Sequence, residues 1–212
     1  MAMDDVRLAG PVRNRVVCGV DEAGRGPLAG PVVVAAVILP RRPRIDGLAD
    51  SKTLTAAERE ALFELIVRDA AVSTVVVGSR RVDAMNIRAA TLWGMSRAVA
   101  ALPDRVDVAL VDGRDEPPSM TVPCRAIVGG DGLSAAIAAA SIVAKVTRDR
   151  LMVQLSRAFP GYGFEQHKGY ATAQHRAALA ALGPCVHHRT SFAPVREAMV
   201  RLTAAAPPSG YG

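Results

Sequence analysis

Short runs of β-branched and aliphatic residues, bounded by glycine and proline, alternate in this sequence with segments whose apolar residues recur every three or four positions. The runs predict strands, and the recurrence predicts amphipathic helices. Strands are predicted over residues 16–20, 32–39, 72–77, 106–111 and 125–128. Helices are predicted over 54–68, 83–100, 131–156 and 171–182, with an irregular loop over 161–170.

The order of these segments predicts an α/β domain with a mixed sheet of about five strands. The start of the first predicted helix is marked by Thr55 as its N-cap, and Glu58 completes a capping box. No internal repeat or linker divides the sequence, so we expect a single domain over 1–205. The N-terminal residues are expected to fray, and the tail 206–212 (APPSGYG) is expected to be disordered.

Composition narrows the class of protein. With 212 residues, of which 50% are hydrophobic and 22% charged, the chain can bury a core. That excludes a wholly disordered, collagen-like or disulfide-framework protein. The longest apolar run, 32–39, lies between Pro31 and Pro40 and is far shorter than the roughly 20 residues that cross a bilayer. We therefore expect no transmembrane helix and no membrane partner.

The N-terminus and the cysteines favour a cytoplasmic protein. Asp4 and Asp5 stand where a signal peptide would be basic and then apolar. An odd number of widely spaced cysteines is typical of reduced thiols and not of a disulfide scaffold; these residues are Cys18, Cys124 and Cys185. Whether Cys18 makes an activity redox-sensitive depends on its exposure.

The charge of the chain favours a polyanionic partner. Its 26 Lys and Arg outnumber its 20 Asp and Glu, which gives a formal net charge of +6. A positive field concentrates phosphates by long-range attraction. Only three of the basic residues are lysines: Lys52, Lys145 and Lys168. Either these sites need a compact ammonium group or the lysines are retained on the surface by chance.

Carboxylates stand where two of the predicted strands end. Asp21 and Glu22 follow strand 16–20, and Asp112 follows strand 106–111. Ligands gather at strand ends in an open α/β sheet, and a carboxylate on a buried strand needs compensation, which a divalent cation supplies. Oxygen ligands suit Mg²⁺ or Mn²⁺. Neighbouring strand residues point to opposite faces, so the first two acids share a metal only if the strand twists or ends there. In the alternative, each aspartate belongs to a turn.

A fourth acid, Asp131, precedes the alanine-rich helix, where it is either the N-cap or a further ligand. Its face of that helix is shared by four small or charged residues, Ser134, Ala138, Ser141 and Lys145. Such a face would let a bulky substrate backbone lie against it. Lys145 stands about 21 Å beyond Asp131 along a straight helix, so we expect it to contact substrate phosphate and not metal. Asp149, farther along, is expected to be structural.

Two loops before the first helix carry further candidates. Gly24 and Gly26 flank Arg25 directly after the acid pair. Glycine allows close approach of the main chain to a sugar-phosphate backbone and arginine supplies a charged fork, although this pattern is common in loops. Ser51 and Lys52 precede a helix start, where a hydroxyl and an ammonium group can hold a phosphate. A plain surface turn explains that pair equally well.

The C-terminal third holds all four histidines. Lys168 and Tyr170 lie on one loop, and the tyrosine either stacks on a sugar or base or packs at a helix start. Zinc binding by Cys185, His187 and His188 lacks the second spaced pair that a four-ligand site needs.

Taken together, these motifs resemble ribonuclease HII, the type 2 ribonucleases H. The segments that carry the resemblance run in order from about residue 16 to 196: 19–27 (GVDEAGRGP), 50–52 (DSK), 111–113 (VDG), 130–131 (GD), 140–145 (ASIVAK), 162–164 (YGF), 167–170 (HKGY) and 191–192 (SF). The first is long enough to be specific by itself, and no motif departs from the family's pattern.

The resemblance implies a ribonuclease H-like fold with a catalytic core over about 15–157 and a C-terminal helical extension over about 158–205. It implies an endoribonuclease that cleaves the RNA strand of RNA–DNA hybrids and nicks 5′ to single ribonucleotides in duplex DNA, leaving 5′-phosphate and 3′-hydroxyl ends. It also implies two Mg²⁺ or Mn²⁺ ions, with substrate completing their ligand shell. A monomer is the default.

By position, the resemblance implies roles for individual residues. The metal ligands would be Asp21, Glu22, Asp112 and Asp131. The loop of Gly24, Arg25 and Gly26 would read the 2′-hydroxyl, and Tyr170 would stack at the RNA–DNA junction. Phosphate contacts would come from Lys52 and Lys145.

Two other functions stay open. A DNA-directed nuclease of the same broad fold would cut all-DNA substrates without needing a 2′-hydroxyl. A catalytically silent hybrid-binding module would keep salt-dependent affinity without turnover. The intact set of acids argues against the silent module.

Overall fold

A five-stranded mixed sheet forms the centre of the protein in the computed structural model, which describes residues 5–10, 15–41, 45–48 and 54–205. Its order is β3-β2-β1-β4-β5. The strands are β1 (Val17–Ala23), β2 (Val32–Ile38), β3 (Ala71–Val77), β4 (Val108–Asp112) and β5 (Cys124–Ile127). The β1–β2 and β2–β3 pairs are antiparallel, whereas β1–β4 and β4–β5 are parallel. The predicted α/β class with a mixed sheet is confirmed.

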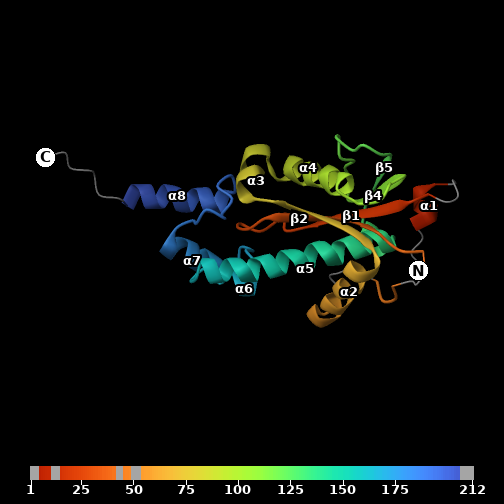
Figure 1. Cartoon of the computed structure of the whole chain (residues 1–212). Coiled ribbons are helices and arrows are strands. Elements are labelled where there is room, and N and C mark those ends of the chain that lie inside the picture. Colours follow the sequence, from red (N-terminus) through yellow and green to blue (C-terminus); the bar gives the residue numbers. More distant parts are fainter. Residues whose placement is uncertain (1–4, 11–14, 42–44, 49–53, 206–212) are drawn as a thin grey trace.

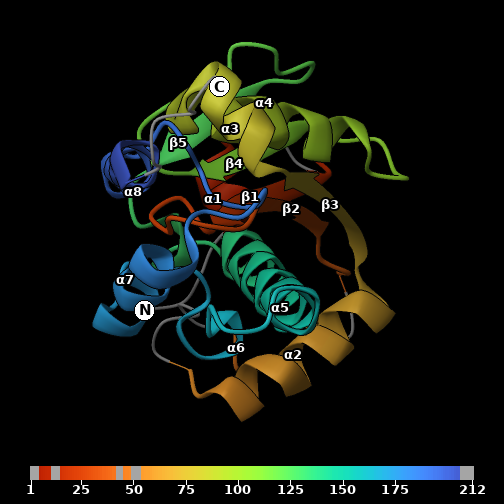
Figure 2. The same cartoon turned by 90° about the vertical axis from the view of Figure 1, so that its left-hand side faces the viewer.

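Helices cover both faces of this sheet (Figure 1, Figure 2). One face carries α2 (Ala56–Asp69) and α5 (Ala135–Ala158), and the other carries α3 (Ser79–Met85) and α4 (Ile87–Ala100). The short α1 (Asp5–Ala9) lies at one end of the molecule. At the opposite end lie three C-terminal helices, α6 (Phe164–His167), α7 (Ala173–Leu182) and α8 (Ala193–Ala205). Within the described residues, no helix is both long and apolar enough to span a membrane.

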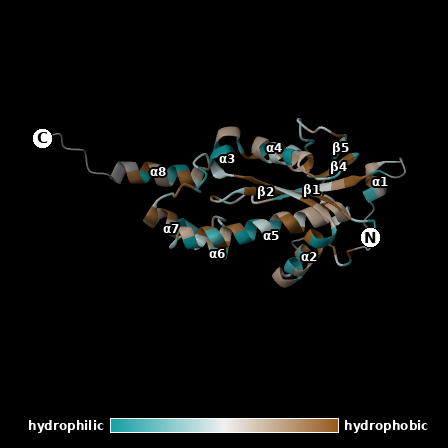
Figure 3. Cartoon of the chain, in the orientation of Figure 1, coloured by the Kyte–Doolittle hydropathy of each residue, from teal (hydrophilic) through white to brown (hydrophobic). Residues whose placement is uncertain are grey.

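The apolar strands are buried on both sides, which explains their nearly continuous hydrophobic sequence. In β2, Val34 and Ala36 belong to the core beneath α3 and α4, whereas Ala35 and Val37 belong to the core beneath α2 and α5. All four are fully buried. Figure 3 shows these strands in brown between helices of mixed colour.

The long helix α5 lies directly against β1. A Cβ atom at Gly19 would be only 2.0 Å from the main-chain carbonyl carbon of Ala136, so the glycine permits this approach. Ser134 and Ala138, on the face expected to receive a substrate backbone, are fully buried. That expectation is wrong for this part of the helix: its residues are small because the helix packs closely on the sheet.

Two helix starts differ from the predictions. The helix expected over 83–100 is two helices, because Asn86 adopts a left-handed conformation with φ 65°. The Asn86 side chain accepts a hydrogen bond from Ala89 N and caps α4. Asp131 is not the N-cap of α5. That position belongs to Ser134, whose hydroxyl accepts from Ile137 N at 3.1 Å.

Smaller differences occur in the loops. The segment 161–170 contains the short helix α6, and the N-terminal region expected to fray contains α1. The capping box of Thr55 and Glu58 at the start of α2 is confirmed. The predicted disordered tail, 206–212, lies outside the described residues.

Candidate active site

The parallel pairing of β1 and β4 brings two acids level at one edge of the sheet. Val20 pairs with Val111, so the next residues, Asp21 and Asp112, lie side by side, with Asp112 ending β4 and Asp21 two residues before the end of β1. Asp21 and Gly19 are two residues apart on β1, so their side-chain positions point to the same face of the sheet, the face covered by α5. β1 continues through Ala23, so the strand does not end at the acid pair.

A short 3-10 turn, η1 (Gly130–Gly132), brings the fourth acid to the same edge. The Gly130 N–H donates to Asp112 Oδ1 at 2.8 Å, which fixes the turn to the end of β4. Asp131 is the next residue and is 5% exposed. The role of Asp131 in the fold is therefore to lie on this turn beside β4, not to start the long helix.

The surroundings of Asp21 disfavour its ionised form. Burial raises its pKa well above the usual range for a carboxyl group, and the negative charges of Glu22 and Asp112 raise it further. Hydrogen bonds from Glu22 N, at 2.7 Å, and from the Ser141 side chain act in the opposite direction. Three of the predicted acids are thus close enough to repel one another, and a bound cation would relieve that repulsion.

Glu22 is held from the other side by the loop that follows β1. Arg25 Nη1 lies 3.3 Å from Glu22 Oε1, and the Arg25 side chain is 50% exposed. A surface ion pair of this kind contributes little to stability. Arg25 is therefore a cation that can turn to a substrate phosphate at the cost of one weak contact.

The glycines of this loop have different surroundings. Gly24 is buried with φ 96°, and a Cβ there would be 2.0 Å from Arg148 Nε. Gly26 is exposed, and a Cβ there would be 3.6 Å from Tyr170 Cε1. Tyr170 itself is 47% exposed. The structure thus brings the glycine-rich loop and the tyrosine, 144 positions apart in the sequence, to one surface.

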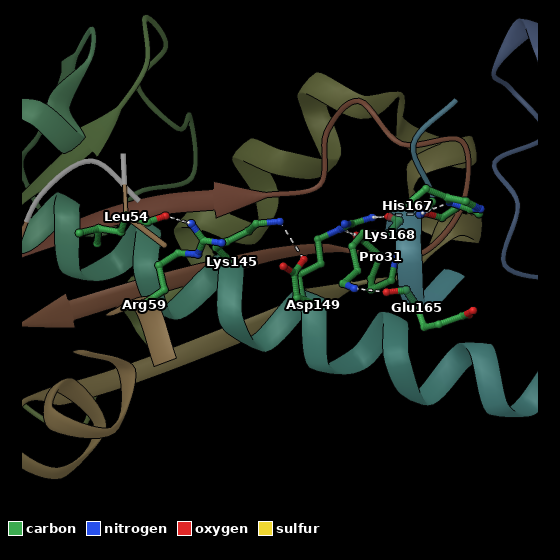
Figure 4. A network of polar contacts seen from close by, with 11 residues as sticks. Pro31, Leu54, Arg59, Lys145, Asp149, Glu165, His167 and Lys168 are labelled. Carbon is green, nitrogen blue, oxygen red and sulfur yellow. Dashed lines mark hydrogen bonds and ion pairs between the residues drawn. The ribbon is translucent and has the colours of Figure 1, made fainter. Parts of the chain in front are cut away.

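The lysines are engaged in local contacts. Lys145 is half-buried on α5 and forms an ion pair with Asp149 at 2.9 Å, which gives Asp149 the structural role expected of it (Figure 4). Lys168 Nζ donates to the carbonyl oxygen of Glu165 (Figure 4). Ser51 and Lys52, the remaining phosphate-binding candidates, lie outside the described residues.

The cysteines and histidines do not form a second centre. Cys18 is fully buried, and burial raises the pKa of its thiol to about 12, which leaves no reactive thiolate at neutral pH. Cys185 Sγ lies 3.2 Å from His188 Nδ1. In the part of the chain that the structure describes, no three Asp, Glu, His or Cys side chains are arranged so that they could already hold a metal ion.

Several cationic residues of the site were not found from the sequence. Arg88 and Arg114 line, with Arg25, a small hollow of about 20 Å³ beside Asp112. Two further arginines, Arg148 and Arg189, are fully buried beneath the glycine-rich loop. The larger cavity, about 360 Å³, lies along α4 around Trp93 and has none of the four acids in its lining.

The donor set fits hard divalent cations. Four carboxylates at one sheet edge supply only oxygen ligands, the kind that Mg²⁺ and Mn²⁺ prefer. Burial and the nearby charges of Glu22 and Asp112 raise the pKa of Asp21, and a bound cation would offset both effects.

Comparison with known proteins decides the family. The family model described as Ribonuclease HII matches residues 18–195. The chain belongs to the ribonuclease HII family. It is therefore an endoribonuclease, as the resemblance of its motifs implied. Ribonuclease HII of Azorhizobium caulinodans is 62% identical over 180 residues, 85% of this chain and 69% of that protein. Ribonuclease HII of Rhodopseudomonas palustris (strain TIE-1) is 56% identical over 192 residues, 91% of this chain and 68% of that one.

Solved structures of ribonucleases H share the fold. The ribonuclease H2 of Pyrococcus horikoshii OT3 superposes with a TM-score of 0.76 at 25% identity, covering 88% of this chain and 98% of that one. A structure titled "Crystal structure of Bst-RNase HIII in complex with Mn2+" superposes with a TM-score of 0.75 at 21% identity, covering 89% and 70%. The predicted ribonuclease H-like fold with C-terminal helices is confirmed.

Proposed function

We propose that this ribonuclease HII hydrolyses the phosphodiester on the 5′ side of a ribonucleotide, in RNA–DNA hybrids and at single ribonucleotides in duplex DNA. One observation carries the proposal: the repelling carboxylates on β1 and β4 adjoin a glycine-rich loop whose exposed Gly26 lies beside Tyr170. Acids that need cations and a loop that can approach a sugar closely thus share one surface.

Asp21, Glu22, Asp112 and Asp131 would hold two Mg²⁺ or Mn²⁺ ions, with substrate phosphate oxygens completing the shell. When bound, such ions supply activation of a water nucleophile and stabilisation of the leaving 3′-oxygen. Water attacks the phosphorus and the P–O3′ bond breaks, which leaves 5′-phosphate and 3′-hydroxyl ends. Ser141 and Gly130 hold two of the carboxylates in place through hydrogen bonds.

The loop of Gly24, Arg25 and Gly26 would select ribonucleotides. The 2′-hydroxyl is the group that distinguishes RNA from DNA at a single sugar. Arg25 and Gly26 are exposed, and the glycine leaves room for a sugar to approach the main chain. Tyr170, exposed beside Gly26, would stack at the junction.

Cations around the site would hold the phosphate backbone. Arg25, Arg88 and Arg114 surround the hollow at Asp112. Lys145 and Lys168 would turn from their local acceptors to substrate, and Ser51 and Lys52 complete the proposed phosphate-binding set. The net charge of +6 supports such a partner.

The proposed setting is the cytoplasm, where the protein would act as a monomer. All three cysteines lie in the described part of the chain and are free thiols. Free thiols favour a reducing compartment.

A cleavage assay tests this function. The substrates are a labelled DNA duplex with one ribonucleotide and a matched all-DNA duplex, each with Mg²⁺, with Mn²⁺ and with chelator. We expect metal-dependent nicking 5′ to the ribonucleotide alone. Equal cutting of both duplexes would indicate a DNA-directed nuclease, and binding without cutting would indicate a silent hybrid-binding module.

A further inference from the structure

Two arginine side chains are buried beneath the glycine-rich loop. Arg189 is 0% exposed and Arg148 is 1% exposed. Within the described residues, every hydrogen bond from these two guanidinium groups goes to a main-chain carbonyl oxygen. A buried cation is costly unless its donors are satisfied, so this arrangement calls for an explanation.

Arg189 binds the carbonyl groups of the loop itself. Its Nη2 donates to Gly24 O at 2.6 Å and to Gly30 O at 2.9 Å, and its Nη1 donates to Arg25 O at 2.8 Å. Arginine presents several donors in one rigid plane, which lysine cannot do. One side chain therefore holds the main chain at residues 24 and 25 and again at residue 30.

These bonds set the direction of the loop's N–H groups. In a planar trans peptide the C=O and the following N–H point in opposite directions. Because Arg189 holds the carbonyl groups of Gly24 and Arg25 toward the interior, the N–H groups of Arg25 and Gly26 point away from it. Those are exposed residues of the proposed 2′-hydroxyl reader.

Arg148 performs the corresponding task toward the tyrosine loop. Its Nη2 donates to Lys168 O at 2.9 Å, and its Nε donates to Pro31 O at 3.0 Å. Its guanidinium carbon lies 5.9 Å from the centre of the Tyr170 ring. Arg148 thus joins the end of the glycine-rich segment to the loop that carries Tyr170.

The segment that carries Arg189 is itself anchored to α3. Both carboxylate oxygens of Asp83 are used: one accepts from Thr190 N and Oγ1 at 2.9 Å each, and the other accepts from Ser191 N at 2.9 Å and Oγ at 2.6 Å. Arg189 N also donates to Leu28 O at 2.9 Å. Five hydrogen bonds therefore hold Arg189 and its two following residues in register with the loop.

We infer that Arg189 and Arg148 are positioning residues for substrate selection: they orient the main chain of residues 24–26 and join it to Tyr170, so that the loop meets the 2′-hydroxyl already ordered. The inference rests on the proposed role of this loop. Preorganised donors bind more tightly than donors that must be ordered on binding. Burial lowers the pKa of Arg189 to about 9, which leaves it cationic at neutral pH.

The test is the binding preference for a ribonucleotide, measured in chelator so that nothing is cleaved. Fluorescence anisotropy gives the Kd of a DNA duplex with one ribonucleotide and of the same all-DNA duplex, for wild type and Arg189→Lys. Lysine keeps the positive charge but not the fork of donors. We expect Arg189→Lys to reduce the preference by about five- to tenfold, the effect of one hydrogen bond, through weaker binding of the ribonucleotide duplex alone.

Two further variants separate positioning from general destabilisation. Tyr162→Phe removes a buried hydrogen bond of the same region, from Tyr162 Oη to Gly183 O at 2.7 Å, without touching the loop; it should keep the wild-type preference. Asp83→Asn loosens the anchor of Arg189 and leaves the guanidinium group in place, so it should lower the preference in the same direction. This variant decides the question if Arg189→Lys does not fold.

Each contrary outcome has a distinct meaning. An unchanged preference in the folded arginine and aspartate variants would overturn the inference while leaving the proposed function intact. Equal weakening of both duplexes would overturn it too, because Arg189 would then serve general phosphate affinity. If wild type itself shows no preference, the proposed 2′-hydroxyl reading by this loop fails.

Discussion

Tyr170 occupies a position that main-chain contacts define. Its N–H donates to His167 O at 2.9 Å, and Gly26 of the glycine-rich loop 24–26 lies beside its ring. The ring is 47% exposed, more than a residue whose role is packing would be. Its exposed ring is what the proposed stacking at the RNA–DNA junction requires.

Replacing Tyr170 by alanine should weaken the preference for the junction while slow metal-dependent cleavage persists. Loss of base or sugar stacking costs about 1–3 kcal/mol, so we expect the ratio of single-ribonucleotide to all-RNA cleavage to fall by about tenfold. Tyr170→Phe keeps the ring and should retain the ratio. An unchanged ratio in the alanine variant would refute the stacking role.

A buried histidine pair next to this loop has a defined protonation state. His175 Nδ1 lies 2.9 Å from Tyr170 O, which can only accept, so that nitrogen carries the hydrogen. His188 Nδ1 accepts from Cys185 N at 3.0 Å. The Nε2 atoms of the two rings lie 3.1 Å apart, and His188 Nε2–H donates across this gap. Both rings are therefore neutral in the folded protein.

Because of this pair, the free energy of unfolding depends on pH. Burial lowers the pKa of His188 from 6.5 to about 4, so between these values the unfolded chain binds a proton that the folded protein does not. Stability therefore falls as the pH drops below 6.5, by an amount on the order of 3 kcal/mol at pH 4. Tm measured across this range should fall accordingly. His188→Asn retains an acceptor for Cys185 N and should flatten the slope; an unaltered slope would contradict this assignment.

Close packing of α5 on β1 sets the position of the candidate metal edge. Gly19→Ala would place a Cβ 2.0 Å from a main-chain carbon of α5, and neither element can move without displacing Asp21. We expect a loss of about 3 kcal/mol or more in the free energy of unfolding, measured by urea denaturation. Gly78→Ala is the matched control, since its added Cβ would meet nothing within 4 Å. Equal stability of the two variants would show that this contact is not tight.

Local signals predicted the strands and the start of α2, because periodicity and a capping box lie within a few residues of one another. The predicted helix ran through Asn86, although asparagine favours caps and turns; its φ of 65° and its hydrogen bond from Ala89 N mark the start of α4. The N-cap interpretation of Asp131 was wrong because Ser134, three residues later, is an equally good cap and takes that position. Each error concerns a choice between neighbouring polar residues.

The residues of the candidate site also fall into those that local sequence could indicate and those that it could not. Asp21, Glu22 and Asp112 could be proposed as metal ligands because acids that follow apolar runs are visible in the sequence, and the sheet register places Asp21 beside Asp112. Arg148 and Arg189 were not found, because 26 Lys and Arg give no indication of which two are buried. Apart from Lys168 O, 20 residues after Arg148, their acceptors lie more than 100 residues away in the sequence. Such contacts follow from tertiary structure alone.

Main-chain hydrogen bonds join the C-terminal extension to the segment that follows β1. Leu28 N donates to Gly169 O at 2.8 Å, and Gly30 N donates to His187 O at 2.9 Å, so the extension supplies main-chain partners to the segment after β1. The candidate catalytic acids lie on β1, β4 and η1, whereas Tyr170 and Arg189 lie on the extension. The hydrogen bonds between the two parts hold the proposed cleavage site and the proposed ribonucleotide reader in fixed relation.

Single-turnover cleavage of the one-ribonucleotide duplex in Mg²⁺, by wild type and by Asp21→Asn, tests the metal assignment on which the proposed mechanism depends. Asparagine keeps the shape but removes the charge, so we predict a loss of about 1000-fold or more, equivalent to about 4 kcal/mol of transition-state stabilisation. The circular dichroism spectrum should be unchanged and the Tm of the metal-free protein should not fall, because Asp21 is repelled by its neighbours. Near-normal cleavage by Asp21→Asn would contradict the assignment of these acids as the metal site.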